Sequence, residues 1–148
     1  MFTWQRTELP LPFEVVARAL RRGPRTWIPD YVEGPGGEVL CTIAIGPRLA
    51  RTAEMGLGAV HSGEGWLTVS VSWRAAETDV LFPIFTGELQ AARISDTSTE
   101  LALVGSYQPP LGPVGELVDH VVLHRVASRA LAGFLGRAGE LVGAAAAG

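Results

Sequence analysis

The chain is short of cysteine and of long apolar runs, and each shortage excludes a class of protein. Its 148 residues include a single cysteine, Cys41, which excludes an internal disulfide and a cysteine-rich zinc site. No run approaches the roughly 18 consecutive apolar residues that cross a bilayer, so we expect no membrane span. The first residues lack a basic region followed by an apolar run. We therefore expect no signal peptide and a cytoplasmic protein.

Charge and aromatic side chains are also scarce. Charged residues make up 18% of the chain, and 12 basic against 15 acidic residues give a net charge of −3. This balance argues against a nucleic-acid partner. The apolar fraction is 47% whereas aromatic residues are only 7%, so small apolar side chains would leave room inside a core. The length suits one domain, which we place at residues 1–142, followed by a disordered tail at 143–148.

Alternating apolar and polar residues predict a mainly antiparallel sheet. The first strand is expected at Phe2–Leu9, and a short helix follows at Pro12–Arg22. Turn-forming segments then separate five more strands, which we expect at Glu38–Ile45, Leu49–Val60, Trp66–Ala75, Ile84–Ile94 and Thr99–Tyr107. Short connections between these strands imply a meander, with His61 in a hairpin turn.

The same alternation identifies side chains on the apolar face of the sheet. The inward set that could line a ligand site is Trp73, Phe85, Leu89, Leu103 and Tyr107. Arg51 is ambiguous, because it shares its parity with Ala53 and Met55. Either a bulge intervenes, or Arg51 points inward, where it could pair with a ligand carboxylate or phosphate. Cys41 lies in an apolar strand and is expected to be an inert core thiol.

A long amphipathic helix is expected from Val114 to Val142, about 43 Å at 1.5 Å per residue and thus long enough to cross a curved sheet. Its broad apolar face comprises Leu117, Val121, Ser128, Leu131, Leu135, Ala138 and Val142. Apolar residues on the outer side, Val118, Val122 and Val126, indicate a homodimer or a covering loop.

His120 and His124 lie one turn apart on the predicted buried side of this helix. They can be partly buried rings bonded to backbone or water, polar anchors inside a ligand cavity, or a metal ligand or general base. Zinc would need a third ligand, and no Glu lies between the two histidines as in the metalloprotease motif. We therefore expect neither a metal nor a cofactor.

The order of these elements resembles the START-like (SRPBCC) superfamily, which includes helix-grip lipid-binding domains and the polyketide cyclase/dehydrase family. The local resemblance lies in Phe85–Leu89, in Leu101–Gly112 and in the helix entry Gly115–Asp119. It is good over residues 60 to 142 and weaker before them. It implies an α+β helix-grip fold, in which a curved antiparallel sheet wraps around the C-terminal helix and encloses a cavity. No catalytic residue can be carried over, because the superfamily has no shared catalytic constellation.

Three functions are compatible with this sequence. The first is binding of a small apolar, lipid- or polyketide-like ligand in a cavity between the sheet and the C-terminal helix. The second is a cyclase or dehydrase-type enzyme, in which His120 or His124 acts as a general base and Tyr107 as a proton donor. The third is a structural or partner-binding protein with a filled core.

Overall fold

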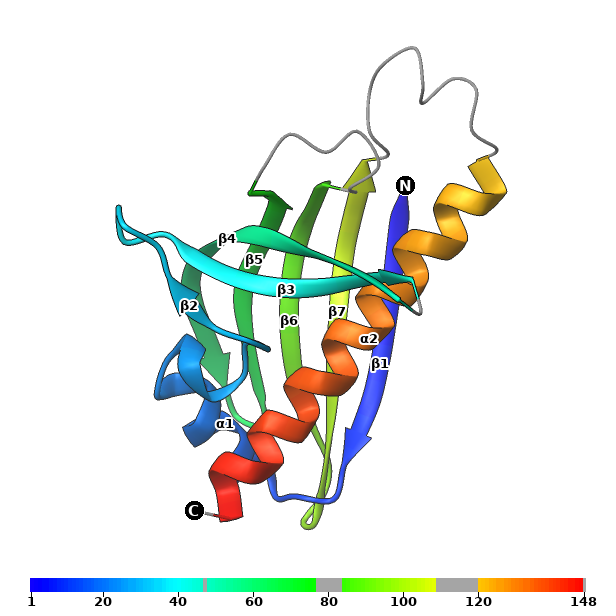
Figure 1. Cartoon of the computed structure of the whole chain (residues 1–148). Helices are drawn as coiled ribbons and strands as arrows, with labels where there is room; N and C mark the ends of the chain where they lie inside the picture. The colour runs from blue at the N-terminus through cyan, green and yellow to red at the C-terminus, as the bar shows by residue number, and fades with distance from the viewer. Residues whose placement is uncertain (47, 77–83, 109–119, 148) are drawn as a thin grey trace.

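The computed structural model describes residues 1–46, 48–76, 84–108 and 120–147. Two helices, a 3-10 helix (η1) and seven strands follow one another along the chain (Figure 1). They are β1 Phe2–Leu9, α1 Phe13–Arg21, η1 Pro24–Thr26, β2 Val32–Glu33, β3 Val39–Gly46, β4 Leu49–Gly63, β5 Trp66–Ala75, β6 Ile84–Ser95, β7 Ser98–Gln108 and α2 His120–Ala147.

All seven strands form one antiparallel sheet in the order β1-β7-β6-β5-β4-β3-β2. Strands β3 to β7 are therefore the predicted meander; β2 extends it beside β3, and β1 adds to it beside β7. The sheet is curved, and α2 crosses its inner side diagonally, with its C-terminal end near α1 (Figure 1). This α+β architecture is the helix grip that the sequence predicts.

The predicted strand bounds are close to those observed, with two differences. The two-residue strand β2 was not predicted, because it is too short to show alternation. Strand β4 continues to Gly63, three residues beyond its predicted end. The prediction of His61 in a hairpin turn is therefore wrong: His61 lies within β4, exposed and opposite Thr68 of β5.

Helix α2 packs mainly on β3, β1 and α1. Its buried side chains are Ala127, Ala130, Leu131, Phe134, Leu135, Ala138 and Val142. The predicted apolar face is wrong at its first described turn, because Val121 is 57% exposed. Val122, predicted to lie outward, is 50% exposed, whereas Val126 packs partly buried against the core.

The C-terminal end of α2 also differs from expectation. Residues 143–147, assigned from the sequence to a disordered tail, continue the helix to Ala147. Positions 114–119, which include Leu117 and Val118, lie outside the described residues. None of the described helices is long and apolar enough to cross a bilayer.

Two polar contacts join segments that are far apart in the sequence. Thr99, fully buried, donates its hydroxyl to the carbonyl of Leu11 at 2.8 Å. Arg137 of α2 pairs with Asp30, which precedes β2. Cys41 is buried on β3, and burial raises the pKa of its thiol to about 12. The thiol therefore stays protonated near neutral pH.

Candidate ligand-binding site

One row of side chains crosses the inner face of the sheet from β4 to β7. The strand register aligns Met55 with Trp73, Trp73 with Phe85, and Phe85 with Tyr107. All four residues are at most 5% exposed. Because residues that are aligned across antiparallel strands share a face, the row forms a continuous, largely aromatic band. We call these four residues the inner row.

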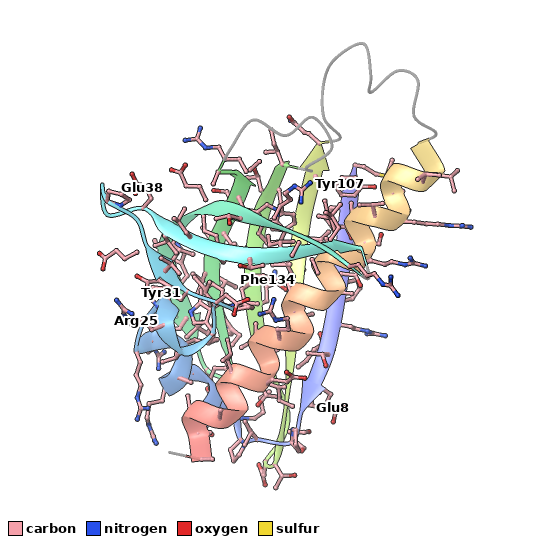
Figure 2. All side chains as sticks on the ribbon, viewed as in Figure 1. Glu8, Arg25, Tyr31, Glu38, Tyr107 and Phe134 are labelled. Carbon is pink, nitrogen blue, oxygen red and sulfur yellow. The ribbon has the colours of Figure 1, made fainter. Side chains whose placement is uncertain are left out.

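Phe134 of α2 covers the Trp73 end of the inner row. The ring of Trp73 stacks on Phe85, with centroids 4.6 Å apart, and contacts Phe134 at 5.1 Å. Phe134 also makes an edge contact with Trp27, with centroids 6.4 Å apart. Figure 2 labels Phe134 near the middle of the molecule, where α2 crosses the sheet. Packing at this end is therefore aromatic on the sheet and helix sides.

A polar atom lies inside this aromatic packing. The indole Nε1 of Trp73 is buried and finds no hydrogen-bond partner among the residues that the structure describes. An indole N–H can only donate, and buried Trp side chains usually find an acceptor. The Trp73 end of the inner row therefore carries an unused donor.

Two glycines leave space for the ring of Phe85 in the middle of the inner row. Gly87 and Gly105 lie opposite each other on β6 and β7. A Cβ added at Gly87 would lie 2.7 Å from the Cα of Gly105 and 2.8 Å from Cζ of Phe85. The ring of Phe85 thus lies over the two glycines, in space that a side chain at either position would occupy.

The Tyr107 end of the inner row is polar. The Tyr107 hydroxyl contacts Nδ1 of His124 on α2 and lies 2.7 Å from the Sδ of Met1. The backbone of Met1 also pairs with that of Tyr107, through N–H···O bonds of 3.0 and 2.9 Å. Burial raises the pKa of Tyr107, so its phenol remains a neutral donor near neutral pH. His124 is exposed rather than buried as predicted, so this end reaches the surface.

The other predicted site residues are dispersed. Leu89 and Leu103 are fully buried and aligned with each other on the inner face, with Val69 aligned to Leu89. Arg51 is exposed, and its Nη1 donates to the carbonyl of Ala50 at 3.1 Å. The inward alternative for Arg51 is therefore wrong. The described bulge in β4 lies further along, between Leu57 and Val60, so Arg51 keeps the parity of Ala53 although its side chain is exposed. The His120 side chain lies outside the described residues.

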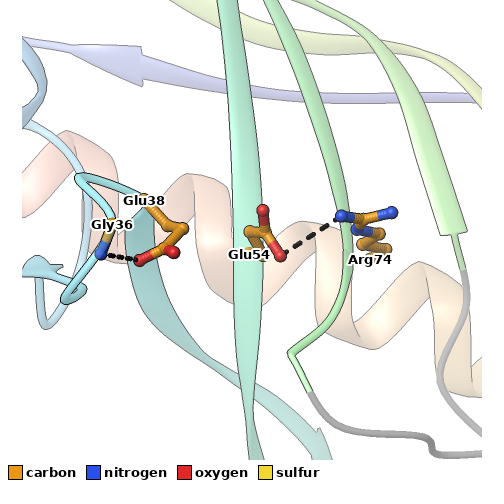
Figure 3. Close-up of polar contacts among 4 residues, drawn as sticks. All are labelled: Gly36, Glu38, Glu54 and Arg74. Carbon is orange, nitrogen blue, oxygen red and sulfur yellow. Dashed lines mark hydrogen bonds and ion pairs between the residues drawn. The ribbon is translucent and has the colours of Figure 1, made fainter.

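A pocket of about 340 Å³ opens over β4, β5 and β6, with most of its lining at positions that alternate with the inner row. Among them are Glu54 and Arg74, which form a 3.4 Å ion pair. Figure 3 shows this pair with α2 on the other side of the strands. On the same view, Glu38 accepts a hydrogen bond from the backbone N–H of Gly36. The remaining lining residues are Met55, Trp73 and Phe85 of the inner row, so the pocket adjoins the inner row as well as the outer face.

Two contributors to the site were not predicted. Phe134 lies about 60° from Leu131 on the helical wheel, on the side away from Leu135, so it borders the predicted apolar face but was not included in it. Met1 joins the site only through the pairing of β1 with β7, and no sequence pattern predicts that pairing.

With this geometry established, comparison with known proteins defines the class of fold. No family model and no curated protein matches the sequence. Solved structures do match over nearly the whole chain. A conserved protein from Geobacillus kaustophilus has a TM-score of 0.63 at 16% identity, covering 97% of this chain and 96% of its own. The chain has a START-like helix-grip fold.

Two further structures with this fold are named for an activity. An aromatase/cyclase from Streptomyces has a TM-score of 0.57 at 13% identity, with 98% of this chain and 93% of that one covered. A human lipid transfer and protein localization domain has a TM-score of 0.54 at 11% identity, with 95% and 76% covered. At these identities the likeness establishes the fold alone.

Proposed function

We propose that this protein binds a small apolar ligand between the inner face of the sheet and α2. The observation that carries the proposal is the inner row, an aromatic band that is covered by a helix and ends in a hydroxyl–imidazole pair. Ligand sites typically combine apolar and aromatic walls with a few placed polar groups that fix orientation. Tyr107 and His124 would be that polar anchor, and Trp73 and Phe85 the wall.

The two structures that are named for an activity support the same class of ligand. One is an aromatase/cyclase and the other a lipid transfer domain, and both use this fold. The ligand class proposed here, a lipid- or polyketide-like molecule, is the one that the resemblance of the sequence to the START-like superfamily implies.

Native mass spectrometry of gently purified protein, followed by solvent extraction, tests this function. We expect a bound mass that leaves on denaturation and extracts into organic solvent. Leu103→Phe, which adds volume at a fully buried inner position, should reduce the bound fraction. Ser106→Phe, at an exposed position of the same strand, is the matched control and should not.

An unfilled protein that also fails to take up an apolar dye such as 1-anilinonaphthalene-8-sulfonate would contradict the proposal. It would favour the third function, a partner-binding protein with a filled core.

The contact between Tyr107 and His124 favours a second candidate, an enzyme of the cyclase or dehydrase type. A neutral phenol beside an imidazole can donate a proton while the imidazole accepts one, and such proton transfer contributes roughly 10²–10⁴-fold to a rate. Tyr107→Phe and His124→Ala should then each lower turnover of a poly-β-ketone thioester measured at saturating substrate. Full activity in both variants would remove the acid–base assignment.

A further inference from the structure

Among the described residues, Nε1 of Trp73 is the buried side-chain nitrogen or oxygen atom that has no hydrogen-bond partner. Thr99 is completely buried and donates to a backbone carbonyl. The hydroxyl of Tyr107, in the same inner row, has two partners. Trp73 is 2% exposed, yet its Nε1 finds no acceptor among the described residues. A buried donor in this state is costly, and most such groups in folded proteins are bonded.

Packing alone does not account for a tryptophan at this position. The contacts of Trp73 with Phe85 and Phe134 are ring-to-ring contacts, which a purely apolar ring could also make. The additional feature of an indole is its N–H. An ordered water would need two to four polar partners, and the rings of Phe85 and Phe134 supply none.

We propose that Trp73 Nε1–H donates a hydrogen bond to an uncharged oxygen of the bound ligand, such as a ketone or ester carbonyl. This inference rests on the proposed binding function and narrows its ligand class. The acceptor would lie about 2.9 Å from Nε1, and the apolar part of the ligand would extend along the inner row. A carboxylate is disfavoured, because its charge would be buried beside two phenylalanine rings with a single donor.

Two probes that differ only in the acceptor test this proposal on the intact protein. They are 2-acetylnaphthalene, which has a carbonyl, and 2-ethylnaphthalene, which has nearly the same shape without one. We expect the ketone to bind roughly three- to tenfold more tightly, the range of one net hydrogen bond. In a ¹H–¹⁵N spectrum, the ketone should shift the Trp73 indole proton downfield, and the hydrocarbon should not.

Substitutions separate Trp73 from the other tryptophans. Trp73→Phe should abolish the preference for the ketone while the protein still binds 2-ethylnaphthalene. Trp66→Phe is the matched control on the same strand, because Trp66 is 45% exposed, and should keep the preference. If Trp73→Phe does not fold, the indole signal of Trp73 can still be assigned in the wild-type spectrum. The chain has four tryptophans, and substituting the other three one at a time identifies their signals.

The outcomes distinguish the inference from the function on which it rests. Equal affinity for both probes, with the Trp73 indole signal unmoved, overturns the role of Trp73 and leaves apolar binding intact. Failure of both probes to bind overturns both. Tighter ketone binding together with the downfield shift supports both.

Discussion

The two ends of the inner row differ in whether the polar group of an aromatic side chain has a hydrogen-bond partner. At one end, the Tyr107 hydroxyl has partners on α2 and at the start of the chain, and it lies beside the exposed His124. At the other end, Trp73 is enclosed by Phe85 and Phe134, and its N–H has no acceptor among the described residues. Among the described residues, the polar group near the surface thus has hydrogen-bond partners, whereas the enclosed N–H of Trp73 has none.

This difference suggests how a ligand would be oriented. The Tyr107–His124 end is preformed, so it can receive a polar group without rearrangement of the core. In the proposed complex, the Trp73 end would gain a hydrogen bond from an acceptor on the ligand. A ligand with one polar end and one internal oxygen would fit both.

The largest expected effect on stability comes from removing the Phe134 ring, which covers Trp73. Phe134→Ala removes the ring that contacts both Trp73 and Trp27 and should lower the free energy of unfolding by about 3–5 kcal/mol. Urea unfolding measures the loss. Val122→Ala, at a half-exposed position of the same helix, should stay within about 0.5 kcal/mol. A similar small loss for Phe134→Ala would mean that the ring does not hold the Trp73 end closed.

A smaller effect is expected in the middle of the row. Gly87→Ala places a methyl group against the Cα of Gly105 and the ring of Phe85, and such overpacking should cost about 1–3 kcal/mol. Gly136→Ala is the control, because a Cβ there meets nothing within 4 Å and the position is helical. It should stabilise the protein by up to about 1 kcal/mol. If thermal unfolding showed that both variants are stabilised, or that both are destabilised, this account would be wrong.

At the other end, Tyr107→Phe removes only the hydroxyl and its contacts with His124 and Met1. We expect a loss of about 0.5–1.5 kcal/mol near neutral pH, typical of one hydrogen bond. Urea unfolding should show the loss, and a stability equal to that of the wild type would mean that the hydroxyl contacts contribute nothing net.

The pH dependence of stability in the Tyr107→Phe variant gives a further comparison between the two ends of the inner row. The pKa of Tyr107 is raised above its ordinary value of 10.0 in the folded protein. The folded state therefore holds the phenolic proton more tightly than the unfolded state does, so stability is lost as pH rises above about 10. The stability difference between wild type and Tyr107→Phe should narrow over that range. Trp73 has no titratable group, so Trp73→Phe should show no such narrowing.

The smallest effect is expected outside the row. Arg74→Gln removes the ion pair with Glu54 on the outer face, where the Arg74 side chain is 69% exposed. The change should cost no more than about 1 kcal/mol and should shrink further as salt screens the pair. A larger cost, measured by urea unfolding at low and high salt, would show that the outer face is coupled to Trp73 on the same strand.

The sequence predicted the fold well wherever a local pattern determined the structure. Alternation assigned Trp73, Phe85 and Tyr107 to one face, because the strands that carry them are half-buried and regular. It left the direction of Arg51 open, and the helical phase was wrong at Val121, because such patterns state which way a side chain points but not whether another element covers it. The contact of Tyr107 with His124 and the missing acceptor at Trp73 depend on how α2 lies across the sheet, and no periodicity contains that information.

The meander has a consequence for the order of assembly. Strands β2 to β7 pair with their neighbours in the chain, so they can form during synthesis from local hairpins. Strand β1 must wait for β7, with which it pairs from Phe2 opposite Ser106 to Leu9 opposite Thr99. Phe134 follows later still. Until it emerges, Trp73 and Phe85 are uncovered on a nascent sheet, which exposes apolar surface to aggregation. A ligand present in the cell at that stage would meet its site open, before the helix closes over it.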